Sequence, residues 1–411
     1  MPMRARTVLL QVCLLAATAG MAQYRAIPLN QGGNNKARVY DDTLFVATDN
    51  GIFSYPIESK GSTWAAYAFE GRAVYDFVKS GSGILAVCDD NGRRGALVTG
   101  DKGKTFSDIT PSDISACMPL SYVGLTLRIM PDSPSHVFMV YPTDGGGKAV
   151  SAMRETRDFG GHWNVVGKAD PYAVAFAVSE TDARHIFVYG MNPEVNCLCP
   201  YILETRDNFL SLTNVPFDID GEQAAQDPAH STFLMLNSVR FCPGKDDVLL
   251  AATSEGMARS DDGGLTWHFT TDEKVDGYTY KGFDRMLFDS GNPQAVYSFR
   301  HSVTDGGLYN VELYYSDDCG ESWHKVYKSP GYASPVIDML QSGRKLLFVS
   351  NDGVFMLDLT DANVLSPTSV NTINTQMPRL HDAVYDVQGR KVGTVKRNSI
   401  YIHNGKKIIM N

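Results

Sequence analysis

Short apolar runs, rather than helical periodicity, make up the hydrophobic pattern of this 411-residue chain. Runs of this kind recur about every fifty positions, at residues 44–47, 84–87, 137–141, 186–189, 248–254, 296–299 and 346–349. Each is four to seven residues long and is bounded by turn-forming residues, a pattern typical of buried β-strands. We therefore expect one repeated β-unit, present seven times.

The fifth unit contains the most complete version of this repeat. Its apolar segments at 238–243, 248–254, 256–262 and 265–270 predict four short strands joined by tight connections. Four-stranded units at a fixed period are typical of β-propellers, whose blades pack around a central axis. We predict an all-β fold, a seven-bladed propeller over residues 23–365.

One motif joins the third and fourth strands of most units. Ser260–Trp267 reads S-x-D-x-G-x-T-W, Ser316–Trp323 reads S-x-D-x-G-x-S-W, and Thr99–Phe106 reads T-x-D-x-G-x-T-F. Thr156–Trp163 differs in one position, where His162 stands, and Thr205 begins what we interpret as a decayed copy. The central residues are Asp101, Asp158, Asp207, Asp262 and Asp318, at separations of 57, 49, 55 and 56 positions.

This motif resembles the Asp-box, or bacterial neuraminidase repeat. Side chains of Asp and Ser/Thr can bond backbone groups in a turn, glycine permits an unusual backbone conformation, and the final aromatic residue buries a large area. We therefore assign the five aspartates a structural role. Calcium binding is the alternative, but the loops lack the spaced carboxylates of a calcium loop, so we predict no metal site and no cofactor.

The first 22 residues have the pattern of a secretory signal peptide. Arg4 and Arg6 precede a short apolar stretch at 8–17, and small residues at Gly20 and Ala22 mark a cleavage site before Gln23. The mature chain then begins with Tyr24–Leu29, an apolar segment without a partner in the first unit. Since the seventh unit lacks a clear fourth strand, we predict that this segment supplies it and closes the ring.

Charge and cysteine content narrow the expected partners. Without the signal arginines the chain has 35 basic and 46 acidic residues, a formal net charge of −11. An acidic surface argues against nucleic acid, and no other apolar stretch predicts a membrane span. Six cysteines remain, which permits disulfides without indicating their pairing. Cys88 and Cys242 lie in strand-like runs and are equally typical of buried small residues.

Beyond residue 365 the composition changes to that of a linker, followed by β-runs at 383–392 and 400–410. Turn residues Gln388-Gly389 and Asn404-Gly405 predict hairpins. This end resembles the C-terminal sorting segment of exported Bacteroidetes proteins, although strands of a full type IX sorting domain are missing. The tail at 366–411 is therefore either a sorting signal, an anchor or a small appended hairpin.

The longest insertions are expected on the face opposite the Asp-box turns, at 142–148, 190–201, 217–231, 271–283 and 301–310. Binding residues concentrate in loops on rigid scaffolds. The insertions combine carboxylates, aromatic rings and cations, as a sugar-binding surface would, although solvated loops are the simpler alternative for each residue. The candidate binding residues are Asp218, Asp220, Asp276, Tyr278, Tyr280, Arg300 and His301, with Glu222 beside them.

Two enzyme families resemble parts of the chain. Sialidases share the Asp boxes and use a Phe/Tyr-Arg-Ile-Pro motif, but Tyr24-Arg25-Ala26-Ile27-Pro28 has one residue too many. Thr48–Gly51 also replaces the expected Glu-x-Arg segment, so no arginine triad and no nucleophile pair can be assigned. Leu127–Tyr141 and Met286–Phe299 are closer to the repeats of xyloglucanase-type hydrolases, sortilin-like receptors and photosystem assembly propellers. The xyloglucanase type uses two propellers, whereas this chain has length for one.

The sequence therefore favours a secreted or cell-surface propeller, a monomer, that binds a glycan or protein across its insertion face without catalysis. The alternative is a glycoside hydrolase acting on an extracellular polysaccharide. A hydrolase needs two carboxyl groups facing each other, one with a raised pKa. No catalytic residue can be assigned from sequence alone.

Overall fold

The computed structural model describes residues 24–58, 63–90, 93–114, 126–130, 133–144, 149–169, 173–192, 199–215, 217–219, 222–223, 235–271, 282–303, 307–329, 331–360, 384–385, 391–392, 399–403 and 406–410. These residues form β-strands and no helix. Two compact units make up the chain, Met1–Pro367 and Thr368–Asn411. The expected signal peptide and most of the linker lie outside the described residues.

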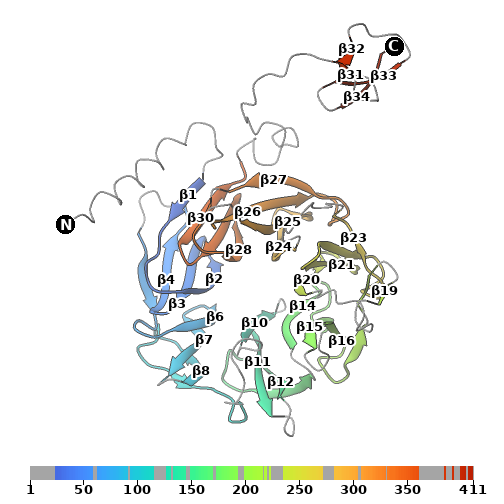
Figure 1. The fold of residues 1–411 in the computed structure, drawn as a ribbon. Helices are drawn as coiled ribbons and strands as arrows, with labels where there is room; N and C mark the ends of the chain where they lie inside the picture. Colours follow the sequence, from blue (N-terminus) through green and yellow to red (C-terminus); the bar gives the residue numbers. More distant parts are fainter. Residues whose placement is uncertain are drawn as a thin grey trace, which may run out of the picture. The chain divides into compact units, whose positions relative to one another are not determined.

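Seven four-stranded antiparallel sheets form the blades of a propeller, as predicted (Figure 1). Blades 1 to 3 are β2 (Asn34–Tyr40), β3 (Thr43–Thr48), β4 (Gly51–Pro56), β5 (Ala65–Ala68); β6 (Val74–Ser80), β7 (Gly83–Asp90), β8 (Arg93–Thr99), β9 (Ser107–Asp108); and β10 (Thr126–Met130), β11 (Ser133–Asp144), β12 (Ala149–Thr156), β13 (Asn164–Ala169).

Blades 4 and 5 are joined by a two-stranded ribbon. Their strands are β14 (Ala173–Val178), β15 (Ile186–Asn192), β16 (Cys199–Thr205), β17 (Thr213–Val215); the ribbon β18 (Asp218–Ile219) and β19 (Glu222–Gln223); and β20 (Leu236–Cys242), β21 (Lys245–Thr253), β22 (Met257–Ser260), β23 (His268–Phe269). Blades 6 and 7 are β24 (Arg285–Asp289), β25 (Asn292–Val303), β26 (Tyr309–Ser316), β27 (His324–Lys328); and β28 (Val336–Ser342), β29 (Lys345–Ser350), β30 (Gly353–Asp358), β1 (Tyr24–Ile27).

The N-terminal strand closes the ring, which confirms the prediction for Tyr24–Leu29. β1 pairs antiparallel with β30, with Tyr24 opposite Leu357 and Ile27 opposite Val354. Ile27 and Leu29 are buried in the apolar cluster between blades 7 and 1. The pairing of the two ends of the ring removes an open sheet edge, and it also supplies the fourth strand that the seventh unit lacked.

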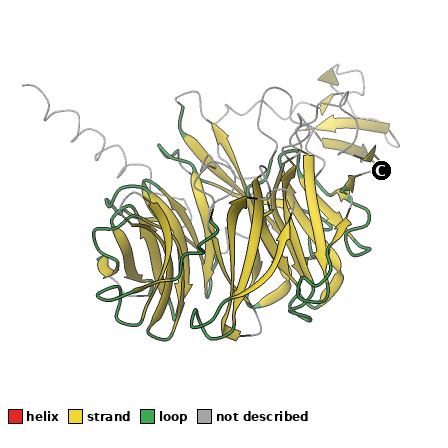
Figure 2. Cartoon of the chain, turned by 90° about the horizontal axis from the view of Figure 1, so that it is seen from below, coloured by secondary structure: helices red, strands yellow, loops and turns green. Residues whose placement is uncertain are grey.

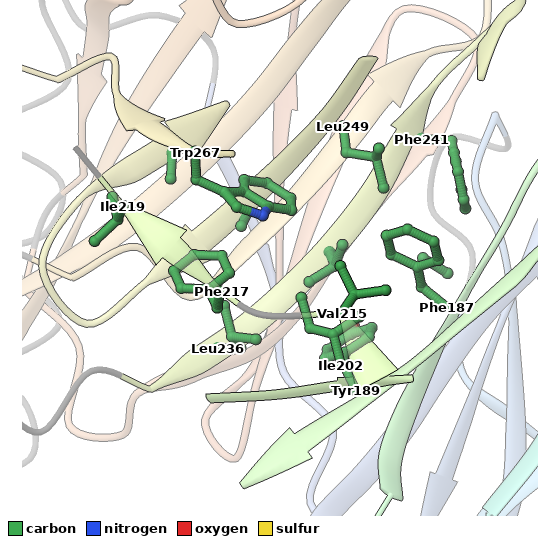
Figure 3. Packing of buried hydrophobic residues seen from close by; sticks show 14 residues of the cluster. Phe187, Tyr189, Ile202, Val215, Phe217, Ile219, Leu236, Phe241, Leu249 and Trp267 are labelled. Carbon is green, nitrogen blue, oxygen red and sulfur yellow. The ribbon is translucent and has the colours of Figure 1, made fainter. Parts of the chain in front are cut away.

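Apolar side chains from adjacent blades fill all seven interfaces. Each interface has its own buried cluster, and Figure 3 shows the one between blades 4 and 5. Second strands such as β3 and β29 are buried at five successive positions, because a neighbouring blade covers each side of the sheet. This double burial explains why their sequences are continuous apolar runs rather than alternating ones.

Strand order also defines two faces, seen edge-on in Figure 2. Connections between first and second strands and between third and fourth strands share one face, here called the turn face. The remaining connections share the insertion face. Part of the expected insertions is strand rather than loop: residues 142–144, 190–192 and 301–303 extend β11, β15 and β25. At these residues the second strand still pairs with the third strand of its blade, so the hairpins extend into the expected insertions.

The C-terminal unit contains β31 (Val384–Tyr385), β32 (Lys391–Val392), β33 (Ser399–His403) and β34 (Lys406–Met410). They form one sheet in the order β32-β31-β33-β34. β33 and β34 pair from Ser399–Met410 to His403–Lys406, so the hairpin expected at Asn404-Gly405 is confirmed.

Candidate functional site

Five aspartate turns, residues 99–106, 156–163, 205–212, 260–267 and 316–323, lie on the turn face between third and fourth strands. At Asp262, Oδ1 accepts hydrogen bonds from Ser260 Oγ (2.8 Å) and the Thr266 backbone N–H (2.9 Å), and Oδ2 accepts one from Thr266 Oγ1 (2.6 Å). The corresponding distances at Asp318 are 2.7, 2.9 and 2.6 Å. These carboxylates are therefore occupied by donors from their own turns.

Asp101 and Asp158 have the same arrangement, with one substitution. Asp101 accepts hydrogen bonds from Thr99 Oγ1 and from the backbone N–H and hydroxyl of Thr105, whereas His162 Nδ1 lies 2.5 Å from Asp158 Oδ2 in place of a hydroxyl. The backbone N–H of Thr105, followed by its hydroxyl, lowers the pKa of Asp101 to about 2. At Asp262 burial acts to raise the pKa and is the largest influence, but the hydrogen bonds from Thr266 and Ser260 together outweigh it and lower the pKa.

The copy interpreted as decayed, at Thr205, retains the complete hydrogen-bond set. Asp207 accepts bonds from Thr205 Oγ1 and from the backbone N–H and hydroxyl of Ser211. Its irregularity lies at Phe209, which occupies the usual glycine position with φ of 66°. Phe209 packs in the cluster between blades 3 and 4, at 5.3 Å from the Phe138 ring, and this burial compensates for the backbone strain. Ser211, at the second hydroxyl position of the motif, is the feature of the sequence that indicates this hydrogen-bond set.

Three of these turns pack against the second strand of the preceding blade. A Cβ at Gly264 would approach the Phe187 ring to 2.8 Å, one at Gly320 would meet Leu250 at 2.6 Å, and one at Gly160 would meet Leu85 at 3.0 Å. These glycines also have positive φ. In their described contacts, the aspartate turns connect blades.

A disulfide reinforces one of these contacts. Cys319, next to Asp318 in the blade 6 turn, is bonded to Cys242 at the end of β20 in blade 5. The sequence left this pairing open, and Cys242 is both buried and cross-linked. Cys88 is buried, in line with its apolar run. Cys117 and Cys197 lie outside the described residues.

Most of the predicted binding residues cannot be placed. Asp220, Asp276, Tyr278 and Tyr280 lie outside the described residues, and Asp218 is described only as a backbone partner of Gln223 in the ribbon. Part of this insertion is not an exposed loop: Phe217 and Ile219 are buried against Trp267 of the blade 5 turn. They pack there because the Phe217 and Trp267 rings, 4.9 Å apart, exclude water from each other.

Arg300 lies on β25 inside the interface between blades 5 and 6, rather than in a solvated loop. It is 7% exposed, and its Nε donates to Glu312 Oε2 at 2.9 Å. Lys325 Nζ lies 2.7 Å from the other oxygen of Glu312. Burial would raise the pKa of Glu312, but the hydrogen bonds and charges of Lys325 and Arg300 outweigh it and lower the pKa. Arg300 is therefore part of a buried ion network.

His301 connects blades 6 and 7. Its Nε2 accepts the backbone N–H of Val336 at 2.9 Å, so the neutral ring carries its proton on Nδ1 and donates it to Asp284 Oδ2 at 2.7 Å. An imidazole held by a carboxylate is a common arrangement at catalytic sites. Here the second nitrogen is bonded to the main chain, so the ring positions β28 rather than presenting a free base.

A pocket of about 290 Å³ lies between blades 5 and 6, next to Arg300. Sequence reasoning did not identify it, because its walls come from segments up to 70 residues apart. Blade 5 contributes Glu255 and Thr270–Thr271, and blade 6 contributes the rings of Phe283, Tyr314 and Trp323 together with Glu321 and Lys325. Trp323 Nε1 donates to Thr270 Oγ1 at 3.0 Å across the interface. The pocket thus combines aromatic surface with charged rims.

The described residues contain no group of three or more potential metal ligands, and no described helix is long and apolar enough to cross a membrane. Among described carboxyl groups with a shifted pKa, every shift is downward, as at Asp182, Asp246, Asp289, Glu312 and Asp358. Such groups are ionised at neutral pH and act as hydrogen-bond acceptors rather than as proton donors.

The fold is similar to those of several solved structures. A GH74 xyloglucanase from Xanthomonas campestris has a TM-score of 0.55 at 14% identity, over 83% of this chain and 54% of that chain. A GH74 enzyme from Niastella koreensis has a TM-score of 0.40 at 16% identity, over 77% and 52%. A virginiamycin B lyase from Staphylococcus aureus has a TM-score of 0.49 at 12% identity, over 82% and 100%.

This chain therefore spans about half the length of the two GH74 enzymes. No protein-family model and no curated protein sequence matches it. At these identities the likeness shows the propeller fold alone.

Proposed function

We propose that this protein is an exported recognition module that binds a glycan, or a protein displaying one, without catalysis. The observation that carries the proposal is the pocket between blades 5 and 6, where aromatic rings, carboxylates and an ammonium group surround about 290 Å³. Small-ligand sites are concave, mostly apolar and carry a few polar groups that orient the ligand. This pocket has room for one sugar ring.

The polar rim suits a neutral or weakly charged sugar. Glu255 and Glu321 are exposed and can accept hydrogen bonds from hydroxyl groups, while the partly exposed Trp323 offers ring surface to C–H groups. Lys325 is partly neutralised by Glu312, so the rim holds no isolated positive charge. The ligand is therefore recognised by shape and hydroxyl pattern more than by net charge.

Binding without turnover is favoured because a hydrolase needs a carboxyl group that is still protonated near neutral pH. Among the described carboxyl groups, every shifted pKa is lowered, so these groups are ionised near neutral pH. The GH74 likeness supports glycoside hydrolysis as the second candidate function. This support is limited to the fold, and this chain spans about half the length of the GH74 xyloglucanase.

Export and sorting belong to the same proposal. The N-terminal segment has the pattern of a signal peptide, and the sequence of the C-terminal unit, which contains a short β-sheet, resembles a Bacteroidetes-type sorting tail. We propose a monomer, secreted or held at the outer cell surface. We assign the five aspartate turns to the Asp-box type and expect no nucleic-acid partner.

A glycan array with the chain beginning at Gln23, followed by incubation and assay for new reducing ends, tests this proposal. We expect saturable binding without cleavage, weakened at least about fivefold, or about 1 kcal/mol, by Glu255→Ala or Glu321→Ala. Lys104→Ala is the matched control. Lys104 occupies the same position in the blade 2 turn as Glu321 occupies in the blade 6 turn.

New reducing ends would instead support the hydrolase. Binding that neither glutamate substitution weakens would place the site outside this pocket, on the insertion face.

A further inference from the structure

Residues of the seven innermost strands form a ring of equivalent positions around the propeller axis. In blades 2 to 6 the position is found from the aspartate turn. The residue just before the turn's Ser or Thr lies on the third strand and pairs with a residue of the second strand. That second-strand residue pairs in turn with the axial position on the first strand. Arg128, for example, pairs with Phe138, which faces Glu155, and Arg240 pairs with Leu250, which faces Arg259. In blades 1, 2 and 7 the same position lies two residues before the end of the first strand. This axial ring comprises Arg38, Val78, Arg128, Ala177, Arg240, Leu287 and Leu340.

Three arginines therefore lie at one level of the axis, on blades 1, 3 and 5, with apolar residues at this level in the other blades. Figure 1 shows their strands, β2, β10 and β20, at the inner ends of the blades. Arg38 reaches across two inner strands: it bonds Asp76 at 2.9 Å, the Phe77 carbonyl, and the Leu127 carbonyl of blade 3 at 3.2 Å. It has its counter-charge in Asp76.

Arg128 and Arg240 differ from Arg38 in this respect. Within the described part of the chain, neither forms an ion pair or a hydrogen bond through its side chain, and both side chains are partly exposed. Burial lowers the pKa of Arg128 to about 9, and the positive charge of Arg240 is the next largest cause. The two guanidinium groups are thus close enough to repel each other, and Asp76, whose charge also acts on Arg128, is already hydrogen-bonded to Arg38.

The next level of the axis does not cancel this charge, because its two cations balance its two carboxylates. Two residues before the axial ring stand Lys36, Asp76, Ser238, Arg285 and Asp338, among others. Lys36 is paired with Asp338 at 2.8 Å, which leaves Arg285 without a described counter-charge. The axis is therefore positive in a chain whose formal net charge is −9. Such a reversal of sign concentrates anions from solution at one place.

We propose that Arg128 and Arg240 form an anion-binding site at the propeller axis, which takes a doubly charged oxyanion: sulfate, phosphate or a dicarboxylate. Two guanidinium groups supply two planar donor forks, a geometry that matches the paired oxygens of such ions. A dianion neutralises both charges at once, whereas chloride offers neither the second charge nor the paired oxygens. This site is separate from the pocket between blades 5 and 6, so neither proposal depends on the other.

Isothermal titration calorimetry tests the site directly. The chain beginning at Gln23 is titrated with sodium sulfate, potassium phosphate and sodium succinate, each against sodium chloride at matched ionic strength. We expect saturable binding of one dianion per chain and none of chloride. Preference for sulfate and phosphate would assign a tetrahedral ligand, and preference for succinate a carboxylate ligand.

Arg128→Gln and Arg240→Gln are each expected to weaken binding at least tenfold. Arg184→Gln is the matched control, because Arg184 is an exposed arginine paired with Asp182 on blade 4. Without added anion, Arg128→Gln should raise the unfolding midpoint by removing repulsion from Arg240, which also shows that the variant folds. The proposal is overturned if no dianion binds saturably, or if both glutamine variants bind as tightly as the parent chain.

Discussion

The two interfaces on either side of blade 5 are held together in different ways. Between blades 4 and 5, fourteen buried residues form one apolar cluster, in which Phe217 and Ile219 of the connecting segment cover Trp267 (Figure 3). Between blades 5 and 6 the cluster has seven buried residues. That second interface has polar and covalent links instead.

Those links are specific and local. The Cys242–Cys319 disulfide joins the end of β20 to the blade 6 turn, and Arg259 donates from β22 to the carbonyl of Cys319 at 2.8 Å. The Arg300–Glu312 ion pair lies at the same interface but within blade 6, so it does not link the two blades. A few strong links hold two blades together without filling all the space between them. The remaining space between blades 5 and 6 forms the pocket.

The largest expected effect is at the apolar interface. Trp267→Ala removes a side chain that is 2% exposed and should lower the free energy of unfolding by about 3–5 kcal/mol. Trp323→Ala, the equivalent change at the second interface, should cost at least about 1 kcal/mol less, because Trp323 is partly exposed. Urea unfolding of both variants measures the difference. Equal losses would mean that the two interfaces do not differ in packing.

The disulfide should account for the next largest effect. Cys242→Ala combined with Cys319→Gly removes a cross-link between residues 77 positions apart and should cost about 2–4 kcal/mol. Glycine is chosen because Gly263 holds the equivalent position of the blade 5 turn, and Cys319 has a positive φ of 56°. Reductant should destabilise the parent chain more than the double variant. A parent chain insensitive to reductant would show that the apolar contacts alone hold this interface.

A change in pH should weaken the apolar interface selectively. His185 packs against Phe187 and Phe241 there, and burial, followed by the charge of Arg206, lowers the pKa of its imidazole. The unfolded chain, with a histidine pKa near 6.5, binds the proton more readily. The contribution of His185 is therefore present above pH 6.5 and is lost as the pH falls through the lower folded-state pKa.

The urea midpoint should fall between pH 7.5 and pH 5, and should fall less for His185→Gln. If the urea midpoint of His185→Gln falls as much between pH 7.5 and pH 5 as that of the parent chain, other groups cause the acid sensitivity.

The smallest effect should come from Leu265→Glu. Leu265 is 61% exposed in the blade 5 turn, at the position that Glu321 holds in the blade 6 turn. Since this position faces solvent in both turns, the substitution should change the free energy of unfolding by less than about 0.5 kcal/mol. A larger loss would mean that the turn position itself contributes to the apolar interface.

Much of the scaffold could be predicted because its signals are local. Apolar runs such as 84–87 and 346–349 become strands buried on both sides, and the motif around Asp262 becomes a turn closed by its own side chains. The closing strand was predictable from one unpaired segment and one incomplete unit. The turn around Asp207 was interpreted as a decayed copy, since Phe209 replaces the glycine that identifies the motif elsewhere, but its hydrogen bonds are complete.

Only the tertiary structure decided what meets between and inside the blades. The sequence by itself determined the strands, the turns and their sevenfold repetition, because hydrogen bonding and burial within a blade depend on residues close in the chain. It could not pair Cys242 with Cys319, join Arg259 to the carbonyl of Cys319, or bring Arg128 near Arg240. Those contacts join different blades or strands, and their geometry depends on the curvature with which the ring closes.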